Sequence, residues 1–197
     1  MRGFFGIGVE GISKPANAGS LLRSAHAFGA SFFYTINPSI DVNELRTSDT
    51  SAAYDHVPVY NFASPKELLL PKGAQLVAVE LTEDAIELPS FRHPTCAAYV
   101  LGPEKANVSH EMLARCDHVI KIPLKFCVNV GVAGALVMYD RMISLGRFAD
   151  RPVKAGGPPQ FAPLELQEIN KVNHAARQWQ GGRAAKRARN AADQGQG

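Results

Sequence analysis

Short apolar segments alternate along this chain with amphipathic and polar segments, and this alternation restricts the fold more than any other feature. Six segments are apolar and of strand length: Phe4–Val9, Ser31–Ile36, Val57–Tyr60, Gln75–Leu81, Ala97–Leu101 and His118–Ile122. The spacing of apolar residues predicts four helices: Asn17–Phe28, Pro65–Leu70, Ser109–Ala114 and Asn129–Leu145. We therefore expect an α/β protein, with a mostly parallel sheet and helices on both of its faces.

Local signals mark where these elements begin and end. Asn17 stands where a helix N-cap is expected, and Gly29 is expected to stop the same helix. Asn129 is a routine N-cap residue at the start of the last helix, which is the longest. Asp41–Asp55 is expected to be a loop with one helical turn, and Pro89–Pro94 a loop.

The composition changes in the last quarter of the 197-residue chain. Residues 149–163 are rich in Pro and Gly, which is typical of a linker between a domain of residues 1–148 and an extension of residues 164–197. Residues 151–197 hold eight Lys/Arg and three Asp/Glu, a net charge of +5, whereas residues 1–150 hold 13 and 15, a net charge of −2. The extension is expected to start as a helix and to end in disorder. Its charge suits either a polyanionic partner or a solubilising end.

Composition excludes several classes of protein. The hydrophobic fraction of 46% and the charged fraction of 20% are those of a soluble globular protein. The longest nearly apolar run, Val128–Tyr139, holds 12 residues, whereas a membrane span needs about 20. The three cysteines form no CxxC pair and the six histidines are scattered singly, so neither a disulfide framework nor a metal site is indicated. We therefore expect a cytoplasmic protein without a metal or a membrane partner.

Gly6, Gly8 and Gly11 match the glycine pattern of dinucleotide-binding folds, but their context argues against that function. In those folds the glycines open a helix directly after a strand, and an acidic residue about 20 positions later binds the ribose. Here Pro15 precedes the helix, and no Asp or Glu lies between Gly11 and Ile40. A nicotinamide or flavin cofactor is therefore not expected.

Three segments place glycines and polar residues at the ends of expected strands or the starts of expected helices. The first reads KPANAGSLLRSA at residues 14–25, and the second reads VLGPE at residues 100–104. The third reads IKIPL at residues 120–124 and CVNVGVA at residues 127–133. In this order they resemble the three motifs of the SpoU/TrmH class of the SPOUT RNA methyltransferase superfamily. The resemblance covers about residues 4–145.

The resemblance implies a C-terminal trefoil knot, which is very rare in proteins. It also implies that S-adenosylmethionine binds in the knot, on loops that follow three strands. The residues that it assigns to cofactor binding are Val79, Glu80, Leu81, Gly102, Ile122, Leu124, Cys127 and Val128. Gly102 suits a close approach of backbone to ligand, and Pro123 fixes a turn. The family usually has Ser at the position of Cys127.

The resemblance also implies a catalytic group formed by Asn17, Arg23, Glu104 and Asn129. Arg23 is expected to meet the ribose 2′-hydroxyl and the adjacent phosphate. Because a guanidinium stays protonated, it would orient the substrate and stabilise the forming oxyanion. Glu104 is expected to brace the Asn or Arg side chains of the site. Asn129 can cap its helix and position the site at the same time.

The function that the resemblance implies is S-adenosylmethionine-dependent 2′-O-methylation of a ribose in tRNA or rRNA. Two alternatives stay open, namely a knotted RNA-binding or assembly factor without turnover, and an RNA base methyltransferase. Family members are homodimers, and the last helix agrees, because it carries small residues beside an apolar stripe. The stripe consists of Val132, Leu136, Tyr139 and Ile143. The expected partners are therefore RNA and a second copy of the chain.

Overall fold

The computed structural model describes residues 3–41, 44–45, 53–103, 106–153 and 155–157. The chain forms two compact units, Met1–Phe148 and Ala149–Gly197. The described residues of the second unit form neither helix nor strand. The expected extension of residues 164–197 lies outside the described residues, so its helix and its disorder stay predictions. The fold and the site described below belong to the first unit.

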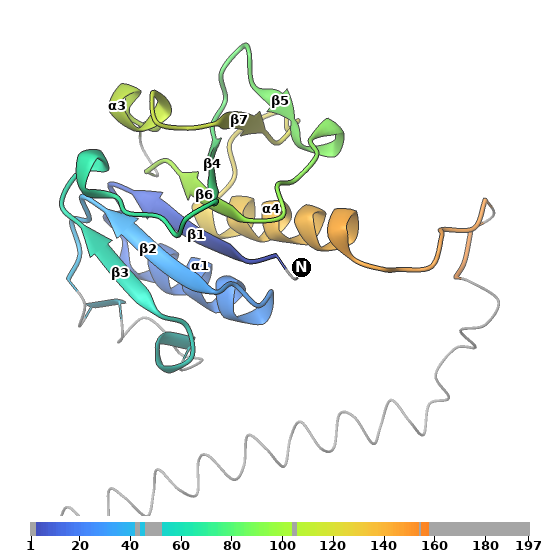
Figure 1. Cartoon of the computed structure of the whole chain (residues 1–197), viewed down its shortest axis with the longest axis horizontal. Helices are drawn as coiled ribbons and strands as arrows, with labels where there is room; N and C mark the ends of the chain where they lie inside the picture. Colours follow the sequence, from blue (N-terminus) through green and yellow to red (C-terminus); the bar gives the residue numbers. More distant parts are fainter. Residues whose placement is uncertain (1–2, 42–43, 46–52, 104–105, 154, 158–197) are drawn as a thin grey trace, which may run out of the picture. The chain divides into compact units, whose positions relative to one another are not determined.

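Seven strands among the described residues form one sheet, and all neighbouring strands are parallel (Figure 1). The strands are β1 (Phe5–Glu10), β2 (Phe32–Ile36), β3 (Val59–Phe62), β4 (Gln75–Val79), β5 (Ile86–Glu87), β6 (Ala97–Leu101) and β7 (His118–Lys121). Their order across the sheet is β3-β2-β1-β6-β4-β7-β5. The expected α/β class with a mostly parallel sheet is confirmed. Because β6, β4 and β7 are neighbours, their carboxyl ends lie side by side.

The ends of β1, β2, β4 and β7 differ from the expected bounds by one or two residues, whereas β3 is displaced as a whole and β5 is additional. β3 starts two residues later than the expected segment Val57–Tyr60, because it pairs with β2 from Val59 to Phe62. β5 was not expected, since its two residues have no strand pattern, and it forms by pairing with β7. In both cases the partner strand determines where the element lies.

The helices that accompany the strands are α1 (Pro15–Ala27), α3 (His110–Leu113) and α4 (Val130–Leu145), and residues 44–45 are helical as well. Three short 3-10 turns are η1 (Ala53–Asp55), η2 (Pro65–Glu67) and η3 (Leu88–Ser90). The expected helix Pro65–Leu70 is thus only the single turn η2, and the expected loop Pro89–Pro94 begins within η3. None of the described helices is long and apolar enough to cross a membrane.

The helix ends follow local chemistry with one exception. The expectation that Asn17 caps α1 is wrong, because Lys14 is the N-cap and Pro15 occupies the first turn, where its missing N–H costs nothing. Gly29 follows α1 at a φ of +74°, in the left-handed region that glycine tolerates, and stops the helix as expected. Asn129 caps α4 as expected, since its Oδ1 accepts the N–H of Gly131 at 2.8 Å.

On one face of the sheet, α1 and α4 pack side by side (Figure 1). Leu21 and Leu22 of α1 share a buried core with Val137 and Met138 of α4 and with strand residues of this face. Gly134 of α4 lies against Leu21, and a β-carbon there would overlap with the Leu21 side chain. The two helices can therefore approach closely, which brings the start of α4 to the start of α1.

The opposite face is covered by α3 and by residues around η2. Its core includes Met112 of α3 and Leu68 after η2, packed with Tyr34 of β2 and Val100 of β6. Successive residues of a strand point to opposite faces, so a sheet buried on both sides needs strands that are apolar along their length. All residues of β2 and β6 are buried, as this arrangement requires. The expectation of helices on both faces is confirmed.

Candidate functional site

A cavity of about 390 Å³ lies at the carboxyl ends of β4, β6 and β7. Its walls come from residues 79–81 at the end of β4, from residues between 101 and 107 after β6, and from residues between 121 and 133 after β7. Parallel sheets typically bind ligands just beyond the carboxyl ends of their strands. Both the position and the size of this cavity are typical of a small-molecule site.

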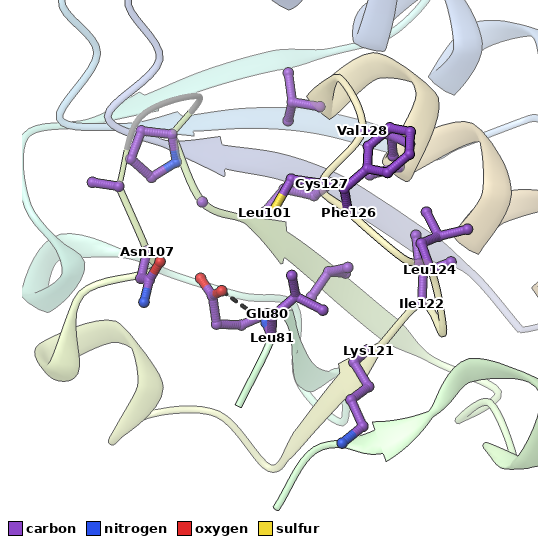
Figure 2. Close-up of a pocket in the computed structure, with 16 residues that line it drawn as sticks. Glu80, Leu81, Leu101, Asn107, Lys121, Ile122, Leu124, Phe126, Cys127 and Val128 are labelled. Carbon is purple, nitrogen blue, oxygen red and sulfur yellow. Dashed lines mark hydrogen bonds between the residues drawn. The ribbon is translucent and has the colours of Figure 1, made fainter. Parts of the chain in front are cut away.

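All eight residues assigned to cofactor binding line this cavity: Val79, Glu80, Leu81, Gly102, Ile122, Leu124, Cys127 and Val128. Figure 2 shows Glu80 between Asn107 on one side and Phe126 on the other. The fold thus brings together three segments that are far apart in the sequence. Their role as cofactor ligands stays a prediction.

The cavity also has lining residues that the sequence did not single out: Leu101, Pro103, Ala106, Asn107, Lys121, Phe126, Val130 and Ala133. Lys121 is the last residue of β7, so the rule that ligands lie beyond the carboxyl ends of parallel strands could have found it. Phe126 is a large apolar side chain that is 78% exposed. Its only signal in the sequence is its place between the two halves of the third motif.

Gly102 lies where the chain after β6 folds back on itself. A β-carbon at this position would lie 3.0 Å from the backbone N of Val108 and 3.3 Å from Oε2 of Glu80. The sequence suggested that glycine serves the close approach of a ligand here. The structure shows instead that the backbone of the same loop comes close to Gly102. A larger residue at this position would displace the loop.

Of the described residues that line the cavity, Glu80 and Lys121 are charged. Glu80 is half-buried, and its Oε1 accepts the N–H of Leu81 at 2.8 Å, as drawn in Figure 2. Lys121 Nζ donates to the carbonyl of Glu83 at 3.1 Å and lies 3.4 Å from that of Thr82. Both side chains therefore hold the segment after β4, and the remaining walls are largely apolar.

Two of the residues assigned to catalysis meet next to the cavity. Nδ2 of Asn129 donates to Oδ1 of Asn17 at 2.8 Å, while Oδ1 of Asn129 caps α4. This bond joins the first turn of α1 to the start of α4, directly after the lining residue Val128. Asn17 is thus held beside the site although it is not the cap of its own helix.

The other two residues assigned to catalysis are placed differently. Arg23 lies on the exposed side of α1, about one and a half helical turns beyond Asn17, and is not among the lining residues of the cavity. Glu104 lies outside the described residues. The structure thus brings Asn17 and Asn129 together and leaves Arg23 toward solvent.

The described cysteine, histidine and acidic side chains form no metal site. No group of three or more His, Cys, Asp or Glu side chains within the described ranges could hold a metal ion. Cys127 is an exposed free thiol at the cavity. Burial raises the pKa of the Cys116 thiol to about 12, with a smaller contribution from the charge of Asp117. Cys116 is therefore a protonated, unreactive thiol.

A second polar cluster, none of whose members lines the cavity, lies between α4 and β6. Nδ1 of His93 lies 2.6 Å from the Tyr99 hydroxyl, and Nε2 lies 2.9 Å from Oδ2 of Asp140. Burial lowers the pKa of His93, and the opposing effect of Asp140 does not reverse this shift. The ring is thus neutral at pH 7. Its Nε2–H donates to Asp140, and Nδ1 accepts the proton of Tyr99.

The model of the SpoU rRNA Methylase family matches residues 5–139, which is more than half of the chain. The chain belongs to the SpoU family. This confirms the resemblance drawn from the three motifs, so the chain is a SpoU/TrmH-family RNA methyltransferase of the SPOUT class.

Curated relatives of this SpoU-family chain include tRNA (guanosine(18)-2′-O)-methyltransferase from Thermus thermophilus. That protein is 31% identical over 140 residues, which cover 67% of this chain and 71% of the relative. The Escherichia coli protein of the same name is 29% identical over 142 residues, which cover 67% of this chain and 60% of the relative. This chain thus spans about three fifths of the length of the E. coli protein.

Among solved structures, the SpoU methyltransferase AviRb from Streptomyces viridochromogenes in complex with the cofactor AdoMet resembles this fold with a TM-score of 0.65. The identity is 22%, and the match covers 73% of this chain and 61% of that one. At this level of identity the likeness concerns the fold alone, and it agrees with the α/β architecture described above.

Proposed function

We propose that this SpoU-family protein uses S-adenosylmethionine to methylate the 2′-hydroxyl of a ribose in tRNA or rRNA. The main support is that all eight residues assigned to the cofactor line one cavity at the carboxyl ends of β4, β6 and β7. The T. thermophilus and E. coli relatives are named as 2′-O-methyltransferases of tRNA. AviRb was solved with AdoMet bound.

The residues around the cavity suit this cofactor. The cavity offers apolar walls to an adenine ring, formed by Val79, Leu101, Ile122 and Val128. Its volume of about 390 Å³ lies within the usual range for small ligands. The carboxylate of Glu80 suits a ligand that carries a sulfonium cation. When bound, S-adenosylmethionine supplies a methyl group that passes from sulfur to the ribose oxygen as that hydroxyl loses its proton.

The RNA side of the site is assigned to Asn17, Arg23 and Asn129. Arg23 is an exposed residue of α1, and its guanidinium is assigned to bind a phosphate and the ribose oxygen as negative charge develops there. The bond between Asn129 and Asn17 keeps the starts of α4 and α1 together beside the cavity. Glu104, which lies outside the described residues, is assigned to bracing these side chains. A free 2′-hydroxyl distinguishes RNA from DNA as the substrate.

The proposal includes the trefoil knot and the homodimer of the family. For the knot, the support is family membership together with a cavity built from three chain segments. For the dimer, the support is α4, which buries Val137 and Met138 against the sheet but exposes Val132, Leu136 and Tyr139. A surface that presents the same apolar residues on two copies suits a two-fold interface. Sedimentation at micromolar concentration is expected to show a dimer, and a monomer would contradict it.

Arg23→Ala is the variant that separates an enzyme from a binding module. Removing one preorganised donor costs about 10²–10³-fold in rate, so methyl transfer is expected to fall by that factor. S-adenosylmethionine affinity should stay unchanged, because Arg23 does not line the cavity. Arg23→Lys should restore only part of the activity, since an ammonium lacks the planar fork. Wild-type activity of Arg23→Ala would place the site elsewhere.

Gly102→Val tests the cofactor pocket itself. The added side chain meets the backbone of Val108 at a distance that only a shift of the loop can relieve. Calorimetry should therefore show a loss of S-adenosylmethionine binding in a folded protein. Unchanged binding would contradict the assignment of the cavity.

Analysis of modified nucleosides distinguishes the proposed reaction from its alternatives. RNA treated with the protein and S-adenosylmethionine is digested and examined by mass spectrometry for ribose-methylated nucleosides. A base-methylated nucleoside would favour the base methyltransferase, and cofactor binding without any methylated product would favour the assembly factor.

Deletion of residues 181–197 should weaken RNA binding and flatten its salt dependence if that segment contacts phosphates. A cytoplasmic location is part of the proposal and agrees with the three unpaired cysteines.

A further inference from the structure

Two carboxylates from different strands hold the segment that follows β6. In the sheet, β6 lies between β1 and β4. Glu10 is the last residue of β1, and Glu80 directly follows β4. Oε2 of Glu80 accepts the N–H of Val108 at 2.6 Å, and Oε2 of Glu10 accepts the N–H of Ser109 at 2.9 Å. Two consecutive amides of the β6–α3 segment are thus bound by carboxylates from the two strands that flank β6.

These bonds fix the return of the loop that begins at Gly102. Residues 101–103, 106 and 107 of this loop line the cavity, and Val108 next to them is buried in the core. Ser109 continues into α3, where its Oγ accepts the N–H of Met112. Hydrogen bonds between a carboxylate and an amide are shorter and stronger than neutral ones. The loop is therefore held at its far end by a buried anchor and by two charge-assisted bonds.

Glu80 also connects two walls of the cavity. Its Oε1 accepts the N–H of Leu81 in the β4 segment, and its Oε2 accepts the N–H of Val108 in the β6 segment. Glu10 has a different position, because it is 8% exposed and does not line the cavity. One carboxylate of the pair can therefore touch a ligand, whereas the other acts only through the loop.

We propose that Glu10 and Glu80 form a carboxylate clamp that sets the last part of the β6–α3 segment, residues 106–109, in its binding geometry before the cofactor arrives. A loop that is already ordered loses less conformational freedom when a ligand binds, so the clamp raises affinity. Glu10 is a positioning residue for the reaction. The link to catalysis depends on the proposed function, but the state of the loop in the free protein does not.

The first experiment measures hydrogen exchange at the amides of Val108 and Ser109 in the full chain without ligand. In Glu80→Ala the Val108 amide, and in Glu10→Ala the Ser109 amide, should exchange at least about tenfold faster than in the wild type. Glu10→Gln and Glu80→Gln keep a carbonyl acceptor and should restore most of the protection. Glu87→Ala, on exposed β5, serves as the control and should change neither amide. Unchanged exchange in both alanine variants would overturn the clamp.

The second experiment asks whether the clamp serves the cofactor. In Glu10→Ala, the KM for S-adenosylmethionine should rise about tenfold while kcat at saturating cofactor and the KM for RNA stay close to wild type. Glu10→Gln should recover most of the affinity and is the folded variant of choice if Glu10→Ala unfolds. Faster exchange with an unchanged KM in Glu10→Ala would overturn the positioning role. Wild-type protein that fails to bind S-adenosylmethionine but shows the exchange pattern would refute the proposed function and leave the clamp standing.

Discussion

Replacing Arg141 by methionine should destabilise the protein more than any exposed arginine can. Arg141 lies on α4 and is 6% exposed. It donates to the carbonyls of Pro94 at 2.5 Å and Thr95 at 2.7 Å, and to the Tyr99 hydroxyl at 3.2 Å. Its guanidinium also lies 5.2 Å from the ring centre of Phe5. One side chain thus connects α4 to the segment before β6, to β6 and to β1.

The contacts of Arg141 determine how much unfolding free energy the substitution should cost. Methionine fills much of the arginine volume but donates no hydrogen bond, so two carbonyls with short bonds lose their charged donor. Each hydrogen bond to a charged group contributes about 1.5–3 kcal/mol. Part of this free energy is regained, because the folded protein no longer bears the cost of desolvating a buried guanidinium. The expected loss is about 3–5 kcal/mol of unfolding free energy, the range for breaking a buried charged contact.

Urea denaturation followed by circular dichroism measures this loss at one fixed protein concentration, since association would shift the midpoint. Arg115→Met is the matched control, because Arg115 is exposed and donates to the carbonyl of Leu68 at 2.9 Å. Because Arg115 is exposed and water can replace part of this single bond, the loss should be about 1–2 kcal/mol, below that of Arg141→Met. If Arg141→Met costs no more than Arg115→Met, the network around Arg141 does not hold α4 to the sheet.

Two further predictions concern titration and thiol chemistry. Burial lowers the pKa of His93 in the folded protein. As the pH falls below about 6.5, the histidine is therefore protonated in the unfolded chain before it is protonated in the folded protein. The free energy of unfolding that is present at neutral pH is lost over this range. The unfolding free energy should therefore drop less between about pH 7 and pH 5 in His93→Gln than in the wild type, and equal slopes would contradict this. Iodoacetamide at about pH 8 should label exposed Cys127 but not Cys116, whose pKa burial raises to about 12. S-adenosylmethionine should slow the labelling of Cys127, which peptide mass spectrometry can measure. An unchanged labelling rate of Cys127 would mean that the cofactor binds elsewhere.

The sequence by itself determined the elements whose signals act over a few residues. β6 lies at Ala97–Leu101 as expected, because a run of apolar residues between loop residues needs no distant information to be identified as a strand. α4 begins after Asn129 for the same reason, since the cap binds an amide two residues away. Half of the residues that line the cavity were also predicted, because the resemblance to the SpoU/TrmH motifs assigned them to cofactor binding.

Only the tertiary structure decided the contacts that depend on which strands are neighbours. Glu10 and Ser109 are 99 positions apart and meet because β1 lies beside β6, while Asn17 and Asn129 are 112 positions apart and meet because α1 packs on α4. The place of β3 was likewise set by its pairing with β2. The physical reason is that an apolar pattern specifies which side chains are buried, but the same pattern suits many strand orders. The packing of the whole sheet selects one of them, and with it the partners of each polar side chain.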